Sequence, residues 1–291
     1  MDAPAGPPAE VRADVALSET GVDRLVRAQH PSCAGPVRAF ATGWDNALFR
    51  VGDHHLARMP RRQMGADNLL RERRCLPWVP PLPLAVPHHT HEGAPDADYP
   101  YPWALTAFHE GEPAGTLALD GPATATDLAA LLEALHRPAP AEVPTDAARS
   151  MPLSARDPSV SALLDRLPDS GPLKRAWAAG LAADPWSAPP VWVHGDLHPF
   201  NLLTRAGRLS VLLDWGDVFR GDPAPDLAAA WMLLEPRHHG PIREQVDDAT
   251  WVRGTGWAVY YGAVLWDAAA KGAGAGLGEV ARRTLARLSG S

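Results

Sequence analysis

Lysine and cysteine are both scarce in this chain of 291 residues. Lys174 and Lys271 are the only lysines among 27 basic residues, and Cys33 and Cys75 are the only cysteines. Two cysteines cannot build a disulfide framework or a four-cysteine metal site. No window holds the roughly 18 apolar residues that a membrane span needs, and the first residues lack a basic segment followed by an apolar run. We therefore expect a cytoplasmic protein with no membrane partner.

An excess of basic charge is also absent. The chain has 34 acidic residues against 27 basic ones, a formal charge of -7 and a sequence pI near 5.9. Nucleic-acid binding depends on clustered cations that displace counterions from phosphates. The arginine-rich stretch at 61–74 has helical spacing and is interpreted as a solvated helix face. Nucleic acid is therefore not expected as a partner.

The order of the patterns predicts an α+β chain in two lobes. Short apolar or alternating runs at 37–40, 47–51, 55–59 and 103–108 are typical of strands, and 61–76 has helical spacing. Helical stretches then dominate, at 125–136, 160–167, 173–183 and within 226–288, around a compact strand cluster near 191–213. We predict a disordered terminus (1–10), an N-terminal lobe (11–106), a hinge (107–113) and a C-terminal lobe (114–291).

Two histidine groups invite a metal interpretation. His194 and His198 have a spacing that chelates zinc on a helix, but Pro199 argues against a helix there. The segment that holds His88, His89 and His91 is bounded by prolines and is predicted to be a loop. Structural histidines are the favoured interpretation of both groups.

The most informative segments are VWVHGDLHPFNLL and LSVLLDWGD. Each begins as an apolar strand and delivers a carboxylate at its end, Asp196 and Asp214, and Asn201 follows five residues after the first. Phosphoryl transfer needs one carboxylate to accept a hydroxyl proton, and a second carboxylate with an amide oxygen to hold Mg²⁺. These residue types suit that hard cation.

These segments resemble a known family. HGDLHPFN (194–201) is similar to the HGDxxxxN catalytic loop of the aminoglycoside phosphotransferase-like kinases, small-molecule kinases that share the protein-kinase fold. LDWG (213–216) resembles their metal-binding strand end, and GDPAPDLA (221–228) resembles their GDPxxDLA segment. The resemblance implies a bilobal protein-kinase-like fold, with an antiparallel-sheet lobe over the nucleotide and a larger helical lobe.

The resemblance also implies roles in the catalytic lobe. Asp196 would be the catalytic base, and Asn201 and Asp214 would bind Mg²⁺. His194 and Asp226 would support the loop. Asp217 would either touch a second metal ion or face solvent.

In the N-terminal half, the resemblance implies a nucleotide cover. ATGWDNALFRV (41–51) takes the place of the glycine-rich loop but carries only Gly43, and backbone amides from Trp44 to Asn46 would face the phosphates. No lysine precedes residue 174, so Arg58 would replace the phosphate-binding lysine, since its fork can hold two oxygens. Arg61 and Arg62 are alternatives, and Glu72 would orient the cation.

WALTAF and the residues that follow it resemble the family's hinge. Thr106 would be the gatekeeper, and the base of ATP or GTP would bond to the backbone of Ala107 and His109.

The predicted function is ATP-dependent O-phosphorylation of a small molecule. The expected acceptor is an aminoglycoside, macrolide, nucleoside or peptide antibiotic, and the protein would act as a resistance or self-resistance enzyme. One alternative is a kinase for choline, homoserine or a sugar, and another is a catalytically silent nucleotide-binding scaffold. The protein would be a monomer or homodimer. Acidic residues of the helical half could attract a cationic acceptor; these are Asp157, Asp165, Glu235, Asp247, Asp248 and Asp267.

Overall fold

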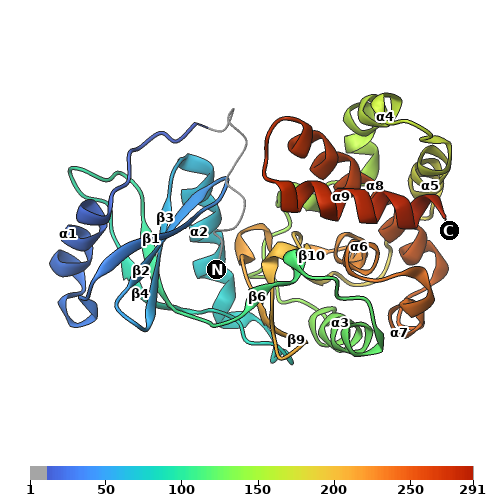
Figure 1. Cartoon of the computed structure of the whole chain (residues 1–291). Coiled ribbons are helices and arrows are strands. Elements are labelled where there is room, and N and C mark those ends of the chain that lie inside the picture. The colour runs from blue at the N-terminus through green and yellow to red at the C-terminus, as the bar shows by residue number, and fades with distance from the viewer. Residues whose placement is uncertain (1–11, 291) are drawn as a thin grey trace.

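The computed structural model describes residues 12–290, and the segment 1–10, predicted to be disordered, lies outside them. The chain forms two lobes, a sheet-rich one on the left of Figure 1 and a helical one on the right. No helix in the described part of the chain is long and apolar enough to cross a membrane.

The N-terminal lobe is built on a five-stranded antiparallel sheet in the order β1-β2-β3-β5-β4. Its elements are α1 (Glu19–Gln29), β1 (Val37–Thr42), β2 (Asn46–Val51), β3 (His55–Pro60), α2 (Gln63–Cys75), β4 (His89–Gly93) and β5 (Trp103–Ala107). The strands predicted at 37–40, 47–51 and 55–59 are confirmed as a meander. The loop predicted around the histidines is wrong in part, because 89–93 pair with β5 as an edge strand.

Side chains that alternate along the strands give the two faces of the sheet different contacts. Phe49 and Val51 of β2 are buried under Val22 and Leu25 of α1. Successive strand side chains point to opposite faces, so Arg58, directly opposite Leu48, lies on the other face. That face looks toward α2 and the second lobe (Figure 1).

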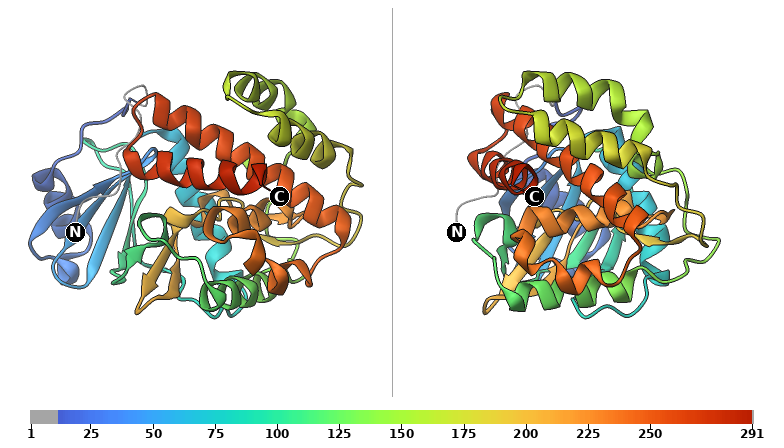
Figure 2. Two further views of the ribbon diagram at one scale, coloured as in Figure 1. Left: turned by 45° about the vertical axis from the view of Figure 1, so that its right-hand side comes forward. Right: turned by 90° about the vertical axis from the view of Figure 1, so that its right-hand side faces the viewer.

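The C-terminal lobe is mostly helical. Its elements are β6 (Glu112–Pro113), α3 (Pro122–Leu135), α4 (Asp157–Arg166), α5 (Gly171–Ala182), β7 (Val191–Val193), β8 (Leu202–Arg205), β9 (Arg208–Leu212), β10 (Phe219–Gly221), α6 (Ala224–Leu233), α7 (Gly240–Arg243), α8 (Asp248–Ala270) and α9 (Ala275–Ser289). Every residue of α6 is buried. The long helices α8 and α9 lie side by side over it (Figure 2).

Two connections join the lobes. β5 ends at Ala107, and the next strand, β6, already pairs with β8 of the second lobe. Earlier in the chain, the Ala85 amide donates to Ser210 O at 2.9 Å, and the Leu212 amide donates to Ala85 O at 2.9 Å. The segment after α2 is therefore anchored on β9, and α2 is held between the lobes.

Candidate active site

A buried aspartate accepts hydrogen bonds from the backbone of the segment after β7. Asp226, in the first turn of α6, is fully buried and accepts the His194 amide at 2.8 Å and the Gly195 amide at 2.9 Å. His136 Nε2 lies 3.3 Å from the same carboxylate. Buried backbone N–H groups need such acceptors, so Asp226 holds the loop that presents Asp196.

We expect Asp226→Asn to destabilise the fold by about 1–3 kcal/mol, because the amide nitrogen would face a backbone donor and leave it unpaired. Urea unfolding checks this. Asp165→Asn is the control, since Asp165 is 70% exposed beside Lys174 and should change the free energy of unfolding by less than about 0.5 kcal/mol. Equal effects of the two variants would contradict the bracing role.

Gly195 is required by the path of this loop. Its φ is +80°, and a Cβ there would stand 2.5 Å from the Asp217 carbonyl oxygen. Tyr261 of α8 donates its hydroxyl to Gly195 O at 2.8 Å. The loop is thus clamped between α6, α8 and the segment that carries Asp217.

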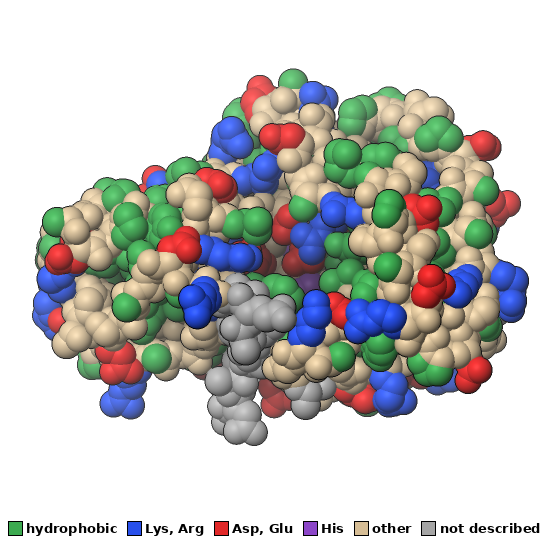
Figure 3. All heavy atoms as spheres, turned by 90° about the horizontal axis from the view of Figure 1, so that it is seen from above, with side chains coloured by type: hydrophobic (Ala, Val, Ile, Leu, Met, Phe, Trp, Pro, Cys, Tyr) green, Lys and Arg blue, Asp and Glu red, His purple; other side chains and the backbone are tan. Residues whose placement is uncertain are grey.

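Asp196 emerges from the clamped loop with both carboxylate oxygens engaged. Asn201 Nδ2 donates to Asp196 O at 2.9 Å and to its Oδ2 at 3.2 Å. Arg149 donates to Oδ1 at 3.0 Å, and its other arm reaches Asp217 Oδ2 at 3.1 Å. His198 Nε2 lies 3.6 Å from Oδ2. In the space-filling view, acidic, basic and histidine side chains gather in the hollow between the lobes (Figure 3).

Asp214 is brought to the same place by the strand pair β8–β9. The Leu213 amide donates to Asn201 O at 2.8 Å, and Leu213 O lies 3.0 Å from His194 Nε2. Asp214 then adopts a left-handed conformation with φ of 58°, which turns its side chain out of the strand direction. The side chain remains 45% exposed.

Arg58 links the two lobes at this point. One arm forms an ion pair with Glu72 of α2, and the other donates to Asp214 Oδ1 at 2.7 Å. Glu72 also accepts the Trp215 amide at 3.2 Å, and its second oxygen lies 2.8 Å from His89 Nε2. Arg61 and Arg62 are not in this set, so among the three arginines only Arg58 stands beside Glu72 and Asp214.

Charge compensation keeps this cluster ionised. Burial disfavours the charge of Glu72, but the Arg58 guanidinium outweighs burial and holds the pKa of Glu72 below its usual value. The pKa of Asp214 is lowered too, because the nearby Arg58 guanidinium outweighs the partial desolvation of this carboxylate. Burial also opposes the charge of Arg58, yet Asp214 and Glu72 raise its pKa.

The groups around Arg149 behave differently. Burial raises the pKa of Asp217, and Arg149 offsets only part of that rise. Burial lowers the pKa of His198, although the nearby Asp196 opposes this. His198 Nδ1 accepts the Phe200 amide at 3.1 Å, which leaves Nε2 as the protonated nitrogen of a neutral ring, directed toward Asp196.

The turn at 43–46 is tied to the start of α2. Arg61 donates to Gly43 O at 2.9 Å, Arg62 forms an ion pair with Asp45, and the Arg61 amide donates to Asp45 O at 2.7 Å. Trp44 is 40% exposed at the tip, and the buried Asn46 Oδ1 has no hydrogen-bond partner. Contacts of Trp44 and Asn46 with phosphates stay a prediction.

At the end of β5, the backbone N–H and C=O of Ala107 face the space beside β4. Ala107 lies opposite His55, and the next amide, Phe108 N–H, donates to His54 O at 2.8 Å. Hydrogen-bonded and non-hydrogen-bonded pairs alternate in antiparallel strands, so the Ala107 N–H and C=O point away from β3. Burial lowers the pKa of the His109 ring. Base recognition by Ala107 and His109 also stays a prediction.

The acidic residues considered for a cationic acceptor all have partners within the protein. Asp157 accepts Trp177 Nε1 at 2.7 Å, Asp165 pairs with Lys174 at 2.7 Å and Glu235 with Arg287 at 2.7 Å. Asp247 caps α8 through the Thr250 amide at 2.6 Å, Asp248 pairs with Arg243 and Asp267 with Arg166 at 2.7 Å. Four of these six carboxylates are thus paired with an arginine or a lysine, which weakens the sequence argument for a polycationic acceptor.

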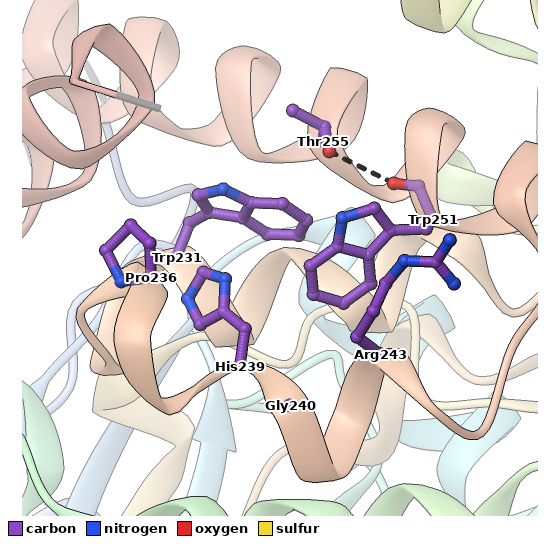
Figure 4. Close-up of a pocket in the computed structure, with 7 residues that line it drawn as sticks. All are labelled: Trp231, Pro236, His239, Gly240, Arg243, Trp251 and Thr255. Carbon is purple, nitrogen blue, oxygen red and sulfur yellow. Dashed lines mark hydrogen bonds between the residues drawn. The ribbon is translucent and has the colours of Figure 1, made fainter.

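A shallow aromatic pocket lies elsewhere in this lobe. The Trp231 and Trp251 rings have centroids 4.5 Å apart, and His239 packs edge-on against both. Figure 4 shows these rings between α6, α7 and α8, with Thr255 bonded to Trp251 O at 3.1 Å. This pocket is separate from the groups around Asp196, and its rings serve helix packing.

Several residues of the site were not identified from the sequence. Arg149 lies in a proline-rich loop without periodicity, and His89 falls in a strand that was predicted as a loop. Tyr261 sits on a helix that gives no sign of its contact with Gly195. None of the three belongs to a short motif, so only the tertiary contacts identify them.

The oxygen atoms that Asn201 and Asp214 leave free fit a hard cation. Asn201 uses Nδ2 on Asp196, which leaves its amide oxygen for a cation, and Asp214 uses Oδ1 on Arg58, which leaves Oδ2. Oxygen ligands of this kind suit Mg²⁺.

Comparison with known proteins agrees with this geometry. The model of the phosphotransferase enzyme family (APH) matches residues 36–262. The GDP and kanamycin complex of APH(2")-IIia is 19% identical, with a TM-score of 0.72 over 93% of this chain and 98% of that chain. No curated protein sequence matches.

Two further solved structures have the same fold. The macrolide 2'-phosphotransferase MphH from Brachybacterium faecium is 19% identical, with a TM-score of 0.62 over 92% of this chain and 97% of that chain. A thermostable APH(4)-Ia mutant with AMP-PNP and hygromycin B is 16% identical, with a TM-score of 0.61 over 94% and 99%. The predicted bilobal kinase-like fold is confirmed, and the match over 36–262 shows that the chain belongs to the phosphotransferase enzyme family.

Proposed function

We propose that the protein is an O-phosphotransferase that moves the γ-phosphoryl group of ATP or GTP to a hydroxyl of a small molecule. The observation that carries the proposal is the meeting of Asp196 and Asn201, from one loop, with Asp214, which Arg58 connects to the sheet lobe. This set supplies a proton acceptor, oxygen ligands and a fixed cation within one hollow.

The proposed step uses these residues in separate roles. Asp196 orients the acceptor hydroxyl and takes its proton as the hydroxyl oxygen forms a bond to the γ-phosphorus, and the bond from that phosphorus to the bridging β–γ oxygen breaks. Asn201 and Asp214 would hold Mg²⁺, which would offset phosphate charge. Arg58 binds phosphate oxygens, while Glu72 keeps its fork in place.

For the acceptor we propose a hydroxylated antibiotic or a related natural product. Kanamycin and hygromycin B are named in complexes of the similar structures, and a macrolide is the substrate class in the name of another. The cation beside Asp196 is Arg149. Four of the six acidic residues considered for a cationic acceptor are paired with an arginine or a lysine. We therefore expect acceptors with little positive charge to be phosphorylated at least as well as polycationic ones.

The test is nucleotide consumption by the purified protein with Mg²⁺ against aminoglycosides, macrolides, nucleoside and peptide antibiotics, choline, homoserine and sugars. Consumption with one class that vanishes in Asp196→Ala supports the proposal and names the acceptor. Turnover with choline, homoserine or a sugar alone would assign a metabolite kinase. Nucleotide binding without turnover on the whole panel would contradict the enzyme and favour a silent scaffold.

A further inference from the structure

A group of metal-binding side chains lies in the sheet lobe, on the face away from the catalytic hollow. Cys33, His55 and His91 each offer one ligand atom, and these atoms all lie within 4.8 Å of one another. Cys33 Sγ is 3.5 Å from His91 Nδ1 and 3.6 Å from its Nε2. All three side chains are partly exposed, so an ion can reach them.

The fold brings these residues together from three separate elements. Cys33 ends the short 3-10 helix η1 (Pro31–Cys33) that follows α1. His55 starts β3 and shares a face with Ala57, which is buried beneath α1, and His91 of β4 lies opposite Leu105 on that same face. The cluster therefore spans β5 from one neighbouring strand to the other, beneath the end of α1.

We propose that Cys33, His55 and His91 form a binding site for a divalent cation of intermediate softness, with Zn²⁺ as the reference ion. A thiolate with two imidazoles is a typical zinc donor set, whereas Mg²⁺ takes oxygen ligands. Zinc bonds of about 2.0–2.3 Å require ligand atoms somewhat closer together than 4.8 Å. Side-chain rotation in a partly exposed cluster supplies that closure.

His30 lies against the cluster without being counted as a ligand. Its ring centroid is 5.1 Å from that of His91, and its Nε2 donates to Glu92 O at 3.0 Å. Three protein ligands leave a position for water. A bound ion would tie η1, the short helix after α1, to β3 and β4 across β5, close to the strand end at Ala107.

The experiment uses the full chain, reduced and freed of metal, in excess Mg²⁺ so that the oxygen ligands of the catalytic hollow are occupied. Co²⁺ is titrated while the thiolate-to-cobalt absorption band is recorded, and Zn²⁺ is then added to displace it. We expect one equivalent of Co²⁺, a thiolate band and displacement by Zn²⁺. Cys33→Ser should abolish the band, and His91→Ala should weaken binding at least about tenfold.

Matched controls keep the result interpretable. Cys75→Ala removes the other cysteine, which ends α2 and is buried against the core of the second lobe. His54→Ala removes the exposed histidine beside His55. Both should bind like the parent chain. Thermal melting of each metal-free variant shows that it is folded, and Zn²⁺ should raise the melting temperature of the parent and the controls but not that of Cys33→Ser.

Three results would overturn the site: no thiolate band in the parent chain, a band that survives in Cys33→Ser, or a band that is lost in Cys75→Ala. None of these outcomes depends on phosphoryl transfer, because the ligands lie outside the catalytic groups.

Discussion

Replacing Asp196 by Asn should lower kcat with the best acceptor by about 10²–10⁴-fold and leave nucleotide affinity unchanged. The range is what a positioned general base contributes. Asp196 is the carboxylate at the mouth of the clamped loop, and it contacts Asn201 and Arg149 rather than Arg58. Its loss should therefore affect proton removal more than nucleotide binding. Single-turnover rates with separately measured nucleotide Kd values test this.

Asp217 provides the matched control for this prediction. It contacts the same arginine, Arg149, at 3.1 Å, and its side chain is 18% exposed against 17% for Asp196. The pKa of Asp217 is raised, chiefly by burial, and Arg149 offsets part of that rise. Asp217→Asn should reduce kcat much less than Asp196→Asn. The opposite ranking would move the base to Asp217 and refute the assignment of Asp196.

What could be predicted from the sequence is local. Asp196, Asn201, Asp214 and Asp226 lie within one stretch of 31 residues, numbered 196–226, where apolar strands, a glycine and a helix start fix the spacing. The strands of the sheet lobe were predictable for the same reason, since alternation and short turns act over a few residues.

What the sequence could not predict depends on contacts between distant segments. Arg149 meets Asp196 across 47 positions of the chain, from a loop with no pattern to mark it. His91 reaches Cys33 across 58 positions, and its strand was hidden because HTHEG is too polar to be recognised as an apolar run. Edge strands of this kind are defined by pairing with a neighbour rather than by their own composition.

Arg58→Met should destabilise the protein by about 3–5 kcal/mol at neutral pH, because it leaves Glu72 buried without its cation. Arg58 is 9% exposed and Glu72 3% exposed, so water cannot replace the lost partner. Urea unfolding measures the change. The double variant Arg58→Met/Glu72→Gln should lose much less than the sum of the two single variants. Additive losses would show that the pair is not coupled.

The dependence on pH separates this explanation from a general packing defect. In the parent chain the pKa of Glu72 is lowered below its ordinary value of 4.5, since Arg58 outweighs burial. Its ionisation therefore contributes stability above pH 4.5, and this contribution is lost as the pH falls through the folded-state pKa. In Arg58→Met burial acts unopposed by that cation and raises the pKa of Glu72, so the variant gains relative stability when acid protonates this carboxyl.

The difference in unfolding free energy between parent and variant should thus be largest near neutral pH and shrink on acidification. A difference that stays constant with pH would assign the loss to packing instead. Arg58 would then lack the charge-compensating role on which its proposed binding of phosphates rests.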